Sequence, residues 1–145
     1  MAAGRNSIGR GWGAGYICDP KKRKAIALHA GNHAAARYEK DGWTVERLGK
    51  PCDQRCTRGT EERHVEVKGT RGAATSVELT INEVLHARDM DNTVDLYVVS
   101  DIKVDTRTDP YTASGNKVTL FTDWEPAEED LSPRKYEYRL PDTTS

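Results

Sequence analysis

The sequence predicts an α+β domain in which helices flank a mixed sheet. A long amphipathic helical pattern comes first, short strand patterns follow it, and a second helix leads into the most hydrophobic strand. This grouping of strands between helices is typical of an α/β sandwich. The chain has 145 residues, the length of one ordinary domain. We therefore expect a single domain over residues 19–145, preceded over residues 1–18 by a flexible, basic, glycine-rich arm.

The first helix is predicted over residues 20–40. Asp19 is a favoured N-cap, and Pro20 suits the first helical position. Apolar side chains then recur every three or four residues, which gives the helix one apolar face. Residues 1–40 hold eight Lys/Arg against two Asp/Glu, with four of the basic residues in the run Lys21–Lys24. This basic third could follow a phosphate backbone, or it could be a solubilising end.

A β-hairpin is predicted from two strands, Gln54–Arg58 and Glu62–Lys68. Gly59-Thr60 forms a two-residue loop between them, and glycine at the first loop position suits a type II′ turn. With this loop, Asp53 lies opposite Glu66. Directly opposed residues point to the same face of a sheet, so the two carboxylates should lie together.

The polar face of this hairpin gathers two carboxylates and a lysine, because alternation adds Lys68 to Asp53 and Glu66. Two facing carboxylates repel unless a cation lies between them, and paired carboxylates are what Mg²⁺ takes in phosphoryl-transfer sites. A charged, exposed sheet face is the alternative, since a lone Glu-x-Lys is common and such surface pairs contribute little. The opposite face carries small apolar residues suited to a core: Cys52, Cys56, Val65 and Val67.

The cysteines favour a reducing compartment, because three cysteines at unrelated spacings make no disulfide framework. Cys52 and Cys56 with His64 suggest zinc, but Cys-x₃-Cys lacks a fourth ligand at zinc-finger spacing. Both cysteines also fall on the predicted core face, so we interpret them as small buried hydrophobic residues. No apolar run approaches the roughly 20 residues of a membrane span, and the N-terminus does not read as a signal peptide. We therefore expect a cytoplasmic protein with no membrane partner.

The remaining elements are short. Thr80-Ile81-Asn82-Glu83 is a capping box that opens a second helix to about Met90, so Glu83 is interpreted as a cap rather than a catalytic acid. Residues 69–75 form a glycine-bearing loop that could meet a phosphate or be a plain connection. Strands are predicted at 43–48, 76–79, 95–102 (the central one) and 117–123, with an edge strand at 136–140, a polar loop at 103–116 and an exposed acidic segment at 125–130.

This element order, with Asp53 followed by Glu66-Val67-Lys68, resembles the PD-(D/E)xK nuclease superfamily. Its restriction-endonuclease-like core is αβββαβ and places these residues on the second and third strands. The strings Val65–Thr70 and Leu79–Val84 are similar in particular to the domain found at the C-terminus of the protein called NO VEIN. That domain is placed in the same superfamily and is often of unknown function. The resemblance covers roughly residues 19–102.

The resemblance implies a nuclease that uses Mg²⁺ or Mn²⁺ to hydrolyse phosphodiester bonds, with DNA as the expected partner and restriction or phage defence as the expected setting. Asp53 and Glu66 would hold the metal together with the Val67 carbonyl, and Lys68 would orient the attacking water. A homodimer is also expected, because many such nucleases act as dimers to cut both strands. Four further residues are candidates for contacts with the substrate: His29, Asn32, Thr70 and Arg71.

One position departs from the superfamily pattern. Many members carry a carboxylate on the first helix, where this chain has Ala27. His29 or Asn32 could substitute for it, or a single metal could bind. The fold could also be a catalytically degenerate module that binds nucleic acid or another protein. The basic N-terminal third suits a nucleic-acid partner, and the acidic segment at residues 125–130 suits a protein partner.

Overall fold

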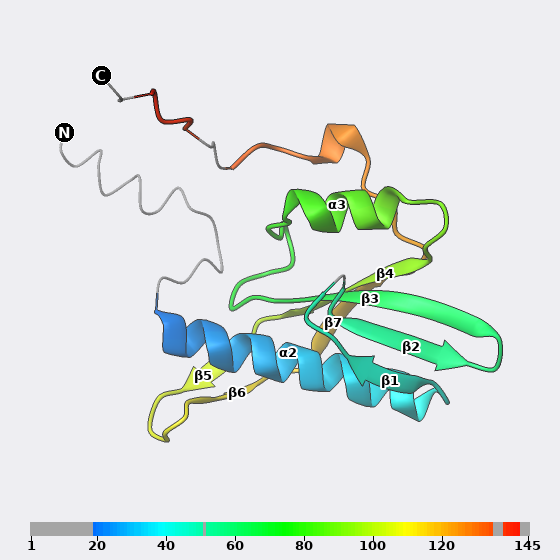
Figure 1. The fold of residues 1–145 in the computed structure, drawn as a ribbon. Coiled ribbons are helices and arrows are strands. Elements are labelled where there is room, and N and C mark those ends of the chain that lie inside the picture. Colours follow the sequence, from blue (N-terminus) through cyan, green and yellow to red (C-terminus); the bar gives the residue numbers. More distant parts are fainter. Residues whose placement is uncertain (1–18, 51, 135–137, 143–145) are drawn as a thin grey trace.

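A computed structural model describes residues 19–50, 52–134 and 138–142, and it has the mixed α+β architecture that the sequence predicts (Figure 1). The predicted arm at residues 1–18 lies outside the described residues. In chain order the elements are α2 (Pro20–Lys40), β1 (Thr44–Arg47), β2 (Gln54–Arg58), β3 (Glu61–Gly69), α3 (Ile81–Arg88), β4 (Val94–Ser100), β5 (Lys103–Asp105), β6 (Thr112–Ser114), β7 (Lys117–Phe121) and the 3₁₀ turn η1 (Glu128–Asp130).

Five strands form the main sheet, in the order β1-β2-β3-β4-β7. β3 and β4 are parallel, and the other neighbours are antiparallel. Parallel neighbours need a crossover connection, and α3 lies within the one that joins β3 to β4. Figure 1 shows α2 along one side of the sheet and α3 over the other. Both sides of the sheet are therefore covered, one by α2 and the other by α3.

α2 begins and ends as predicted. The Asp19 carboxylate accepts a hydrogen bond from the backbone N–H of Lys21 at 2.9 Å, and Pro20 opens the first turn. The apolar face of α2 packs on β3 and β4 as part of the main core. Gly69 allows this close packing, because a Cβ there would lie 2.8 Å from a side-chain carbon of Ile26. The first half of α2 is therefore held against the carboxyl end of β3.

The predicted hairpin register is confirmed. Arg58 pairs with Glu61 and Gln54 pairs with Val65, so the loop is Gly59-Thr60, and Gly59 has a positive φ of 62°. A shift of one residue would turn every side chain to the opposite side of the sheet. This register thus decides which residues of β3 face α2 and which face α3.

β4 is an interior strand, as its hydrophobicity predicts, and all of its residues are buried. The capping box that begins α3 is also confirmed: the Thr80 side chain accepts from the Glu83 N–H, and the Glu83 side chain accepts from the Thr80 N–H. α3 buries only Val84 and Ala87. It is consequently a short helix with few apolar side chains to hold it on the sheet.

Three predicted elements are wrong. Residues 103–116 are not a loop: β5 and β6 pair there, and Val104 and Ala113 pack against the core beside α2. Residues 76–79 form no strand, because this segment leads directly into the cap of α3 and pairs with no described strand. The predicted edge strand at 136–140 is unpaired over residues 138–140, and its start lies outside the described residues.

A buried polar cluster joins α2 to the sheet. Asp95 of β4 is 1% exposed, accepts hydrogen bonds from Tyr38 and from the Asp123 N–H, and forms an ion pair with Arg63 at 2.8 Å. Burial and the Asp95 carboxylate raise the pKa of Tyr38, so its hydroxyl stays a donor. The three partners of Asp95 together therefore compensate its buried negative charge.

Removing this carboxylate should strongly destabilise the fold. Asp95→Ala leaves the half-buried Arg63 without its buried partner, and breaking such a pair costs about 3–5 kcal/mol. We expect a loss of that size in the free energy of unfolding, measured by urea denaturation. Asp91→Ala, at an exposed position, is the matched control and should change stability by less than about 0.5 kcal/mol. Equal effects of the two substitutions would contradict this role of Asp95.

Candidate functional site

A buried carboxylate lies at the centre of the side of β3 that faces α3. Glu66 is 2% exposed, and its Oε2 has no hydrogen-bond partner within the described residues. Asp53 lies beside it, just before β2, and accepts a hydrogen bond from the backbone N–H of Val67 at 2.8 Å. The structure thus brings Asp53 and Glu66 together, as the hairpin register predicts.

The environment of Glu66 disfavours its charged form. Burial, followed by the negative charges of Asp53 and Glu83, raises the pKa of Glu66 to about 8. The Lys68 ammonium acts in the opposite direction and does not cancel this effect. The raised pKa favours a proton on Glu66, and a cation held between the two carboxylates would relieve the same repulsion.

Lys68 and Glu83 complete this polar face. The Lys68 Nζ lies 3.0 Å from Glu83 Oε1, and both side chains are about one-fifth exposed, at 22% and 21%. The same Glu83 oxygen accepts from the Thr80 N–H at 2.9 Å. The interpretation of Glu83 as a cap is confirmed, but its second contact was missed, because only the crossover brings the start of α3 over β3. We call Asp53, Glu66, Lys68 and Glu83 the acidic face.

Ala27, where the resemblance leads us to expect an acid, is exposed on α2. The third carboxylate of this group comes instead from Glu83, in the first turn of α3, and it also acts on Glu66. Glu83 is therefore the carboxylate that the sequence analysis did not assign to the site. A capping-box glutamate is usually explained by the cap alone, so its residue type gave no signal of a second role.

The remaining candidates lie apart from the acidic face or at its edge. The His29 Nε2 is 2.6 Å from the Gly115 carbonyl oxygen, and Asn32 accepts a hydrogen bond from an arginine of β1. Both belong to α2, on the other side of the sheet, and the structure does not bring them to Glu66. Thr70 is buried directly after β3, and Arg71 is exposed beside it.

A second group of polar side chains lies next to the acidic face. Cys52, His64 and His86 each offer one ligand atom, and these atoms all lie within 4.8 Å of one another. The predicted position of Cys52 on the face of Cys56 is wrong, because residue 52 precedes the first residue of β2 and does not follow its alternation. Cys56 does lie in the core beside α2, as predicted.

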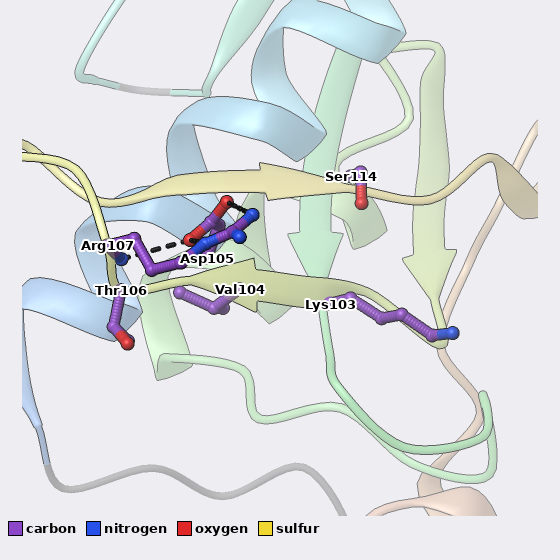
Figure 2. A pocket seen from close by; sticks show the side chains of 6 residues that line it. All are labelled: Lys103, Val104, Asp105, Thr106, Arg107 and Ser114. Carbon is purple, nitrogen blue, oxygen red and sulfur yellow. Dashed lines mark hydrogen bonds and ion pairs between the residues drawn. The ribbon is translucent and has the colours of Figure 1, made fainter.

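A shallow hollow of about 390 Å³ lies over the β5–β6 hairpin (Figure 2). Its charged groups already satisfy one another, since Asp105 accepts two hydrogen bonds from the Arg107 side chain, at 2.9 and 2.8 Å. Figure 2 shows Lys103 pointing away from this pair. The hollow contains none of the residues predicted for the site, so we do not assign it a function.

None of the described helices is long and apolar enough to cross a lipid bilayer. No curated protein and no solved structure matches this chain. A family model, Protein NO VEIN, C-terminal, matches residues 27–112, which is more than half of the chain and includes the whole acidic face. The chain therefore belongs to the family of the NO VEIN C-terminal domain.

Proposed function

We propose that this domain is a nuclease that hydrolyses phosphodiester bonds, preferentially in DNA, with a divalent cation held by Asp53 and Glu66. One observation carries the proposal. The Glu66 carboxylate is buried beside a second carboxylate, and its Oε2 lacks a partner among the described residues. A buried carboxylate oxygen without a hydrogen-bond partner is costly, so a cation at this position would remove that cost.

The donor set fits a hard divalent cation. Asp53 and Glu66 supply carboxylate oxygens, which Mg²⁺ and Mn²⁺ prefer, and the resemblance adds the Val67 carbonyl as a further ligand. Such an ion, when bound, polarises the phosphate and lowers the pKa of its water. Because Glu66 is buried, few bulk water molecules would compete with its carboxylate for the cation.

The protein's own residues would orient the reactants. The Glu83 carboxylate lies 3.0 Å from the Lys68 ammonium and holds it on the acidic face. The positive charge of Lys68 therefore has a defined position. An ammonium there can bind the attacking water or a phosphate oxygen, and it offsets the charge that develops on the phosphate as the P–O bond breaks. Lys68 would thus orient the reactants, while the carboxylates of Asp53 and Glu66 would hold the cation.

Basic residues near the carboxyl end of β3 support a nucleic-acid substrate. Gly69, next to Lys68, lies against Ile26, within two turns of the basic run Lys21–Lys24. Arg71 is exposed in the loop that follows β3. These positive charges near the carboxyl end of β3 would contact the phosphate backbone and make binding depend on salt.

A non-catalytic nucleic-acid-binding module is the second candidate. It is favoured by one observation: Lys68 already forms an ion pair with Glu83, which reduces its availability for a substrate. In that case the domain would bind DNA, with an affinity that falls steeply as salt rises, and would not cut it.

Cleavage should depend on the acidic face. We expect Asp53→Asn and Lys68→Ala to lower Mg²⁺- or Mn²⁺-dependent cleavage of plasmid DNA by about 10²-fold or more, because the first weakens a ligand of the cation and the second removes the positive charge that offsets charge on the reacting phosphate. Initial rates of nicking measure this effect, and circular dichroism checks the fold.

Asp91→Asn and Lys103→Ala are the matched controls, since both change the same residue types at exposed positions. They should retain the wild-type rate. Undiminished cutting by both acidic-face variants would contradict the proposal, and salt-sensitive binding without any cutting by the wild type would favour the second candidate.

The raised pKa of Glu66 also predicts a pH dependence of stability. Its folded pKa of about 8 exceeds the unfolded value, so the stabilisation is present at low pH and is lost as pH rises through about 8. For the metal-free protein we expect the free energy of unfolding to fall between about pH 6 and pH 8 by up to about 1.4 kcal/mol per pH unit. Urea denaturation at these pH values measures the slope.

Glu66→Gln should remove most of this slope, because glutamine does not titrate. Saturating Mn²⁺ should also reduce it in the wild type, since the cation replaces the proton beside Asp53. The same slope in wild type and Glu66→Gln would show that Glu66 does not titrate as described.

A further inference from the structure

The cluster of Cys52, His64 and His86 is assembled from three separate parts of the fold. Cys52 lies in the segment before β2, His64 lies on β3, and His86 lies in the last turn of α3. Their candidate ligand atoms all lie within 4.8 Å of one another, and within the described residues no other group of three such side chains meets that limit. Distant parts of the chain thus place a thiol and two imidazoles around one point.

The two imidazole rings are nearly parallel, and two of their nitrogens point to a shared position. His64 Nδ1 is 2.8 Å from His86 Nε2, and the rings are stacked with centroids 4.9 Å apart. Only one proton can lie between the two nitrogens. A metal ion would instead bond to both of them, at about 2.0–2.1 Å each for zinc.

The outer nitrogen of each ring is also occupied. His64 Nε2 is 2.8 Å from the Glu62 carboxylate, so this nitrogen carries the proton and Nδ1 presents its lone pair to the cluster. On the other ring, the Asn92 side chain contacts His86 Nδ1 at 3.2 Å. An acceptor such as the Glu62 carboxylate orients a histidine ligand in a metal site and strengthens it as a donor.

A reactive cysteine does not explain the cluster. Cys52 is 2% exposed, and burial, followed by the charges of Glu66 and Asp53, raises the pKa of its thiol to about 11. A protonated, buried thiol is a poor nucleophile. Sulfur and imidazole nitrogen are, however, the ligands that select zinc over magnesium and calcium.

We propose that Cys52, His64 and His86 form a binding site for Zn²⁺, separate from the acidic face, in which water fills the fourth position. Two zinc ligands of a tetrahedral site lie about 3.3–3.9 Å apart, so only a small opening of the cluster is needed. The ion joins the end of α3 to the β2–β3 hairpin. α3 buries only two apolar side chains, so it gains most from this link.

Cobalt replaces zinc in such sites and reports on its ligands. We expect Co²⁺ to give the near-ultraviolet absorption band of a thiolate–cobalt bond and the strong visible bands of a tetrahedral site. Zn²⁺ should abolish these bands by competition and should raise the melting temperature of the whole chain. Cys52→Ala should remove the thiolate band, and Cys56→Ala, the matched substitution on the other side of the sheet, should retain it.

His86→Gln tests the site without opening the core, because its ring is only partly buried. It should lower Zn²⁺ affinity at least about 100-fold, and Glu62→Gln should lower it about 10–100-fold. Asp53→Asn should leave the cobalt spectrum intact, which separates this site from the acidic face. No thiolate band in the wild type, a band that persists in Cys52→Ala, or unchanged Zn²⁺ affinity in His86→Gln would each overturn the proposal.

Discussion

The pairing register of β2 with β3 determines where the chemically useful side chains of this domain lie. Two residues at the hairpin loop set this register, and Gly59 takes the positive φ that the turn requires. Val65 and Val67 then face the core beside α2, while Glu66 and Lys68 face α3. A shift by one residue would place the carboxylate in the apolar core and the valines beneath α3.

The side of the sheet that faces α3 carries two groups of side chains that we propose as metal sites. His64 and Glu66 are two residues apart on β3, and Glu83 and His86 are three residues apart on α3, so both elements contribute to both groups. The acidic face offers oxygen to a hard cation, and the cysteine–histidine cluster offers sulfur and nitrogen to zinc. α3 is short and buries little apolar surface, so ions bound at the two groups would help to attach this helix to the sheet.

Much of this arrangement could be predicted from sequence because it depends on local rules. The two-residue loop at Gly59-Thr60 predicted which residues of β2 and β3 pair, and the capping box predicted where α3 begins. The cluster around His86 could not be predicted in this way, because it depends on how the crossover places α3 over β3. Cys52 was placed on the wrong face because the rule of alternation applies only within a strand, and β2 begins at Gln54. The β5–β6 hairpin was missed because its two short strands are mainly polar and bury only small apolar side chains against α2.

The buried carboxylates beneath α3 are the proposed site of a divalent cation. Anomalous diffraction from crystals soaked in Mn²⁺ tests it most directly, since manganese scatters anomalously and accepts the same oxygen ligands as magnesium. The account predicts an anomalous peak between the Asp53 and Glu66 carboxylates that disappears in Asp53→Asn crystals. No peak at these carboxylates in well-ordered wild-type crystals, with Mn²⁺ bound elsewhere or not at all, would contradict it.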